Sequence, residues 1–249
     1  MKPAAIIIIV FNLDKFIGKQ ITLFRYMNIH RSNTDIIVVN NSTDDVMRKS
    51  ILSKCKTQMD YYIETACTDG DNSFSHAFAL NTAFQKFKDS YERIFFVDHD
   101  IFPLNAFSIM VETENIKAAG VEQVREKDGF RVKYFFPGCL MLNMLKVDKS
   151  IIDFTPDGQL GVDTGGKLYP IIHNSKEHEY AFFNEVHHQN SQINKNQYNF
   201  YSIITTPHES KFMHFINASN WAKNDEQDHD ERLESLNNIL NRKINGLKT

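Results

Sequence analysis

The sequence predicts an α/β fold in which a mostly parallel central sheet carries helices on both faces. Apolar strand-like runs alternate with amphipathic helical patterns over residues 4–97, and this order is typical of parallel strands joined by helices. The run 93–97 is apolar at consecutive positions, as expected of a strand covered on both faces. The turn signal Lys127-Asp128-Gly129 lies between two further runs and adds a small antiparallel hairpin.

Each element of the first part has its own signal. Strands are expected at 4–11, 35–40, 59–66 and 93–97, and helices at 14–27, 43–54 and 73–88. The helix over 43–54 has Asp44 and Asp45 at its N-terminus, where acidic side chains cap the chain and favour the helix dipole. The helix over 73–88 carries apolar residues at helical spacing, which predicts one buried face.

The pattern changes after Pro103. Hairpin strands are expected at 117–123 and 130–136, a further buried strand at 138–143, a loop rich in Gly, Asp and Pro at 153–166, a helix at 176–188, a strand at 200–206 and a helix at 225–244. His173, His178, His187 and His188 lie in or just before the predicted helix over 176–188 and lack the spacing of a zinc site, so a solvated face is expected there. The last helix has one apolar stripe, which indicates docking on the domain or on a partner.

Composition limits the class of protein. A chain of 249 residues with 42% hydrophobic residues has material for one sizeable core. The net charge of −3 and the lack of a basic run argue against nucleic acid as a partner. The apolar run 6–10 is too short to span a bilayer, so no transmembrane segment is expected. Cys55, Cys67 and Cys139 have no metal-site spacing and fit free thiols, which predicts a cytoplasmic location.

Two carboxylates follow the apolar run 93–97, at Asp98 and Asp100. The end of such a strand lies at the rim of the sheet, where open α/β folds bind ligands. Alternation along an extended chain sends both side chains the same way, and two acidic oxygen donors suit Mn²⁺ or Mg²⁺ beside a phosphate-bearing substrate. The alternative is an ordinary solvated turn, in which Asp is common.

Four ordered blocks carry a resemblance to a known family. They are the segment 36–44, the segment 72–81 with its Asn81, the Asp98-His99-Asp100 motif, and the segment 214–221 that begins with His214. Together they make residues 4–221 resemble a nucleotide-sugar-dependent glycosyltransferase of the GT-A fold, similar to the large inverting family. The resemblance implies a catalytic domain over 1–221 and a separate C-terminal amphipathic helix over 222–249, through which homo-oligomers could form.

The resemblance also implies roles for the acidic motif. Asp100 would bind the metal ion directly, and Asp98 would bond the ribose or reach the metal through water. His214 would complete the coordination with a ring nitrogen, which Mn²⁺ accepts. Without the resemblance, a lone His before Phe215 is more often an ordinary core or surface residue.

Nucleoside and sugar contacts are expected from two other places. Phe11, Asn12, Asn40 and Asn41 lie at the ends of the first two predicted strands, where an aromatic ring and amides suit a base. Asn40 replaces the acidic residue usual in the family, and both Asn40 and Asn41 equally suit a turn and helix cap. Asn81 belongs to the nucleotide-sugar set through the resemblance. Trp221 would stack on a sugar with Lys223 beside the diphosphate, although Trp221 also suits a packed anchor.

Inversion at the sugar requires a base that takes the proton of the acceptor hydroxyl. Asp163, between glycines in 161–166, is the best-placed carboxylate, with Glu122, Asp153 and Asp157 weaker candidates. Asp163 also suits a helix N-cap, and in a retaining enzyme it would bind donor or acceptor sugar instead.

The predicted function is therefore the metal-dependent transfer of a sugar from a nucleotide diphosphate, UDP in the first instance, to a glycan or lipid-linked acceptor. Two alternatives are open. Nucleotidyl transfer would need a glycine-rich loop after the first strand, and Asn12-Leu13-Asp14-Lys15 has none. A non-catalytic glycosyltransferase-like module would bind sugar or scaffold partners, and the retained acidic pair and His214 argue against it.

Overall fold

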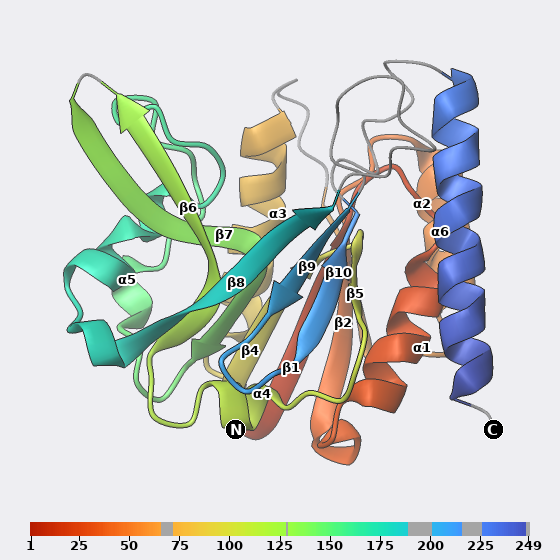
Figure 1. The fold of residues 1–249 in the computed structure, drawn as a ribbon, viewed down its shortest axis with the longest axis horizontal. Coiled ribbons are helices and arrows are strands. Elements are labelled where there is room, and N and C mark those ends of the chain that lie inside the picture. Colours follow the sequence, from red (N-terminus) through yellow and green to blue (C-terminus); the bar gives the residue numbers. More distant parts are fainter. Residues whose placement is uncertain (66–71, 128, 189–200, 216–225, 248–249) are drawn as a thin grey trace.

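The computed structural model describes the chain apart from residues 66–71, 128, 189–200, 216–225 and 248–249 (Figure 1). Its strands form one sheet in the order β3-β2-β1-β4-β7-β6-β8-β9-β10-β5. The strands are β1 Lys2–Val10, β2 Thr34–Asn40, β3 Tyr61–Glu64, β4 Tyr91–Asp98, β5 Ile101–Pro103, β6 Ala118–Lys127, β7 Phe130–Asn143, β8 Tyr180–His188, β9 Tyr201–Thr205 and β10 Lys211–His214.

The α-helices are α1 Ile17–Met27, α2 Asp45–Cys55, α3 Asn72–Phe87, α4 Ile109–Glu112, α5 Tyr169–His173 and α6 Glu226–Gly246. Short 3₁₀ turns lie at Arg31–Asn33, Lys149–Ile151, Gly166–Leu168 and Glu177–Glu179. Up to β4 the order of strands and helices agrees with the sequence prediction, because each strand there is followed by a helix long enough to cross back over the sheet.

The sheet is mixed, and the prediction of a mostly parallel sheet is not confirmed. The strands β3, β2, β1 and β4 are parallel, as is the pair β6 and β8. The pairs β4–β7, β7–β6, β8–β9, β9–β10 and β10–β5 are antiparallel. The predicted strand 138–143 is the second half of β7, so the hairpin arm continues into the centre of the sheet and pairs with β4 in antiparallel orientation.

The predicted helix over 176–188 is wrong. Residues 180–188 form β8, which pairs with β6 on one side and β9 on the other. These two ladders hydrogen-bond the backbone of the segment, so tertiary pairing prevails over local pattern. As a consequence, His187 and His188 point to opposite faces of a strand, beside Ser202 and Tyr201 respectively.

Helices cover both faces of the parallel part, as predicted. Alternation along β1 places Ile6 and Ile8 in one core with α1 and Ile7 and Ile9 in another with α3. The last strands fold back over the first of these faces (Figure 1). Phe212 of β10 there packs against Phe95 of β4, with ring centroids 5.5 Å apart.

The C-terminal helix α6 packs on the domain beside α1 (Figure 1). Its buried residues Leu233, Leu236 and Leu240 join the core that α1 covers, and Lys19 of α1 bonds Asn237. Its role in oligomers and the boundary at 221/222 stay predictions. In the described part of the chain no helix combines the length and apolar character needed to cross a bilayer.

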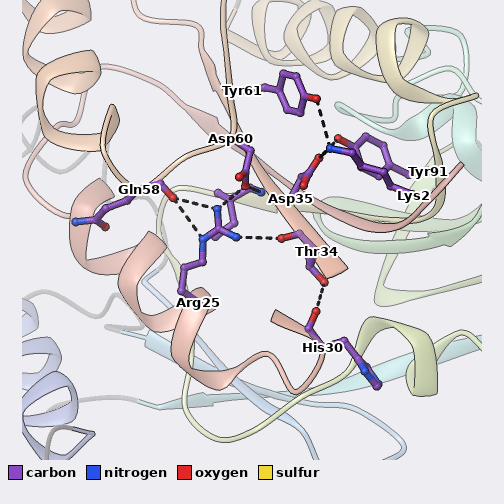
Figure 2. A network of polar contacts seen from close by, with 10 residues as sticks. Lys2, Arg25, His30, Thr34, Asp35, Gln58, Asp60, Tyr61 and Tyr91 are labelled. Atoms are coloured by element: carbon purple, nitrogen blue, oxygen red, sulfur yellow. Dashed lines mark hydrogen bonds and ion pairs between the residues drawn. The ribbon is translucent and has the colours of Figure 1, made fainter. Parts of the chain in front are cut away.

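A polar network lies at the N-terminal ends of the parallel strands (Figure 2). Tyr91 of β4 and Lys2 of β1 both donate to Asp35 Oδ2 of β2, each over 2.6 Å. Burial raises the pKa of Tyr91 and the Asp35 carboxylate raises it further, so the phenol stays protonated and acts as the donor. On the neighbouring side Arg25 bonds the Thr34 carbonyl over 3.0 Å.

Removing either partner of the Tyr91–Asp35 bond gives unequal losses of stability. We expect Tyr91→Phe to lower the free energy of unfolding by about 1 kcal/mol, because Lys2 still satisfies Asp35. Asp35→Ala costs about 1–3 kcal/mol, because the buried phenol is left without an acceptor. Urea denaturation measures both, and equal losses would contradict this account of the network.

Candidate functional site

The two carboxylates of the acidic motif lie where β4 ends and β5 begins. The turn between the strands is held by Gln20 of α1, whose buried side-chain Nε2 donates to the carbonyls of Asp98 and Ile101, both over 2.7 Å. Asp100 is 7% exposed, so its carboxylate is removed from bulk water. Hydrogen bonds from Gln20 thus hold the turn that carries both acidic groups, which is not a solvated loop.

Asp98 has a partner that the sequence analysis did not predict. His76 of α3 lies with its Nε2 2.9 Å from Asp98 Oδ1. Burial disfavours the charged ring, but the nearby Asp98 carboxylate outweighs this and raises the pKa of His76. Burial likewise opposes the Asp98 charge, and His76 outweighs it and lowers the pKa of Asp98. Each group therefore stabilises the ionised form of the other.

Gly138 of β7 makes room for Asp98. The β4–β7 register pairs Val97 with Cys139, which brings the next residue along β4 against Gly138. A Cβ placed on Gly138 would lie 2.2 Å from Asp98 Oδ2 and 2.4 Å from the Phe136 ring. No side chain fits there without displacing the carboxylate.

His214 reaches the acidic motif through the last strands. The antiparallel pair β10–β5 sets His214 opposite Ile101, and Phe215 N donates to the Asp100 carbonyl over 2.9 Å. His214 Nε2 then lies 3.8 Å from Asp100 Oδ1, and its ring stacks on Phe136 with centroids 5.5 Å apart. Burial disfavours its charge, but Glu185 and Asp100 outweigh this and raise the pKa of His214.

The predicted metal ligands fit a divalent cation as a pair of donors, not as a complete cage. In the described residues no three His, Cys, Asp or Glu side chains converge on one point. The 3.8 Å between His214 Nε2 and Asp100 Oδ1 is less than two metal–ligand bonds of about 2.1 Å, so one ion can contact both atoms. Oxygens of a bound phosphate would supply further ligands, as is usual for Mg²⁺.

The predicted nucleoside residues lie together at the ends of β1 and β2. Asn12, at φ 47°, accepts from Thr43 N over 3.2 Å, and its own N–H donates to Ser42 Oγ over 2.9 Å. Phe11 beside it is partly exposed. Asn40 and Asn41 are buried and bond within the protein, Asn40 to Tyr62, Arg48 and Ser42, and Asn41 to Ser75 and Thr65. These amides hold the two loops together, and direct base contact by them stays a prediction.

The other predicted residues are spread more widely. Asn81 bonds Asp153 and the N–H of Phe154, so it joins α3 to the segment between β7 and α5. Asp163 is exposed and accepts from Thr164 N over 2.7 Å. Asp163 also contributes to the raised pKa of His76, which places it within electrostatic reach of the Asp98 side of the site. Trp221 and Lys223 lie outside the described residues.

Sequence reasoning missed three site residues. Gln20 and His76 lie in predicted helices, where their spacing indicates only an ordinary core or surface position. Glu185 lies in the segment wrongly predicted to be a helix. All three act across long sequence separations, which the spacing of residues in one segment does not reveal.

The sequence matches no protein-family model and no curated protein. Three solved structures are similar to part of this chain. Mannosyltransferase PcManGT from Pyrobaculum calidifontis, in complex with GDP-Man and Mn²⁺, shares 16% identity over 56% of this chain and 44% of that chain, with a TM-score of 0.40. S. aureus TarS shares 17% over 48% and 21%, with a TM-score of 0.36. The bifunctional glycosyltransferase WbbM shares 12% over 57% and 32%, with a TM-score of 0.38.

The chain spans less than half the length of each of these three structures. The TM-scores of all three are below 0.5.

Gly138→Ala tests the packing of the acidic motif. We expect a loss of about 1–3 kcal/mol in the free energy of unfolding, because the added methyl group displaces the Asp98 carboxylate from His76. Gly158→Ala is the matched control, since a Cβ there meets nothing within 4 Å. Denaturant unfolding compares the two, and equal stability of both variants would show that Asp98 lies elsewhere.

Proposed function

We propose that this chain is a metal-dependent glycosyltransferase. It moves a sugar from a nucleotide diphosphate donor, for which a UDP-sugar is our first candidate, to a glycan or lipid-linked acceptor. One observation carries the proposal. The end of β4 and the end of β10, far apart in the sequence, bring Asp100 and His214 to 3.8 Å, beside Asp98. Carboxylate and imidazole at this spacing are donors that Mn²⁺ accepts.

The chemistry explains why such a group of residues is needed. The acceptor oxygen forms a bond to the anomeric carbon while the bond from that carbon to the β-phosphate oxygen breaks, and the nucleoside diphosphate leaves with the electron pair. A bound Mn²⁺ or Mg²⁺ stabilises the charge on this leaving group. Asp100 and His214 would hold the ion, and Asp98, fixed by His76, would bond the ribose or a water on the ion.

Asp163 is our candidate for the base in an inverting reaction. Its carboxylate is exposed in the segment between β7 and α5, and Thr164 ties that segment to α3 through a 2.9 Å bond to the Ser73 carbonyl. The acceptor hydroxyl would lose its proton to Asp163 as its oxygen attacks. Phe11 and Asn12, at the rim of the same sheet edge, would contact the nucleoside.

Asp100→Asn is expected to abolish Mn²⁺-dependent binding of UDP, because an amide oxygen is a weaker ligand without the negative charge. Isothermal titration of UDP with and without Mn²⁺ measures the effect. Asp89→Asn is the control, since this exposed carboxylate pairs with Lys149. Folded wild-type protein that binds no UDP in the presence of Mn²⁺ would contradict the proposed function.

Asp163→Asn separates chemistry from binding. We expect kcat to fall about 10²–10⁴-fold with UDP-sugar affinity nearly unchanged, because only proton removal from the acceptor is lost. Transfer assays with a panel of labelled UDP- and GDP-sugars give kcat, and titration gives the affinity. Full turnover by the variant would exclude Asp163 as the base and would favour a retaining course or another carboxylate.

A further inference from the structure

Glu185 is a carboxylate that no predicted role uses, although it lies inside the site. Its side chain, on β8, is only 20% exposed, and its Oε1 lies 3.3 Å from His214 Nδ1. Burial disfavours a carboxylate of this kind unless hydrogen bonds satisfy it. The contact with the His214 ring satisfies this carboxylate and explains its position.

The contact with Glu185 orients the His214 ring. The two ring nitrogens of a histidine point away from each other, so Glu185 on the Nδ1 side leaves Nε2 facing Asp100 Oδ1 at 3.8 Å. Donation from Nδ1–H to Glu185 leaves the Nε2 lone pair for a metal ion. This arrangement also explains why Glu185, His214 and Asp100 form no three-donor cage, since the imidazole separates the two carboxylates.

Two further contacts fix the pair. The hydroxyl of Ser202, a fully buried residue of β9, donates to Glu185 Oε1. Ser202 lies directly opposite His214 in the β9–β10 register, whereas Glu185 of β8 lies opposite Ile204, two residues along β9 from Ser202. The Ser202 hydroxyl therefore reaches Glu185 diagonally on the same face of the sheet. The Phe136 ring stacks on His214 at an interplanar angle of 26°, which limits rotation of the imidazole. Sheet pairing thus holds Glu185, Ser202 and His214 in place.

We propose that Glu185 is a positioning residue, which holds the His214 ring so that Nε2 binds the divalent cation together with Asp100. A carboxylate on the second nitrogen of a metal-binding histidine fixes its tautomer and strengthens it as a ligand, and loss of such a partner costs 10–100-fold in metal affinity as a rough guide. The inference rests on the proposed function, because it takes the cation site of that proposal and adds the residue that orients one ligand.

The test is Mn²⁺ affinity in the presence of UDP, followed by the electron paramagnetic resonance signal of free Mn²⁺, which also reads weak binding. We expect Glu185→Ala to weaken Mn²⁺ binding about 10–100-fold. Glu185→Gln retains an oxygen that accepts from Nδ1–H, so its loss is smaller. Glu126→Ala is the control, because this exposed carboxylate pairs with Arg131 on the β6–β7 hairpin, and we expect the variant to keep the wild-type Mn²⁺ affinity.

The decisive comparison repeats each change in a His214→Ala background. A positioning residue has no effect once the ring that it orients is gone, whereas a purely structural loss persists. Should Glu185→Ala not fold, Glu185→Gln and Ser202→Ala give the same test, each weakening Mn²⁺ binding severalfold only when His214 is present.

The outcomes separate the two proposals. Wild-type affinity in the Glu185 variants, or a loss that persists without His214, overturns the role of Glu185 and leaves the proposed function standing. Folded wild-type protein that binds no Mn²⁺ in the presence of UDP overturns both.

Discussion

The buried side-chain amide of Gln20 is the contact on which the site depends. By bonding the carbonyls of Asp98 and Ile101, it fixes the turn that ends β4 and starts β5. Both carboxylates lie on that turn, and β5 is the strand with which β10 pairs. The same amide therefore sets where Asp100 points and where His214 arrives. Backbone carbonyls buried without such a donor would cost free energy, so the turn and the helix that carries Gln20 stabilise each other.

Charge balance is the second constraint. Asp98, Asp100 and Glu185 are three acidic groups withdrawn from water around the C-terminal end of β4, and desolvation alone would favour their neutral forms. His76 and His214 offset this cost from opposite sides, through α3 and β10. The pairs Asp98–His76 and Glu185–His214 keep their carboxylates ionised, as the lowered pKa of Asp98 and of Glu185 indicates, despite burial that opposes it. The two histidines, and not bulk water, thus stabilise the ionised carboxylates of this cluster.

The sequence allowed the parallel half of the fold to be predicted and the antiparallel half only in part. The elements within residues 4–97 could be predicted because each strand and helix there has its own local pattern of apolar residues. The segment 180–188 has no such pattern, since apolar and polar side chains are mixed along it. Its strand conformation comes from pairing with β6 and β9. Asp98 and Asp100 were visible because an apolar run ends at them. His76 and Glu185 were not, because their partners lie 22 and 29 residues away and on other elements.

The site lies where these two halves meet, which explains why no single motif describes it. The parallel half supplies the acidic pair at the end of β4, together with Gln20 and His76. The antiparallel half supplies Gly138, through the β4–β7 register, and the linked side chains of Glu185, Ser202 and His214. A shift of β7 by one residue would replace Gly138 at Asp98 with a side chain, and the contact distances leave no room for one. Strand register, and not the acidic motif alone, is therefore what makes the carboxylates and imidazoles one site.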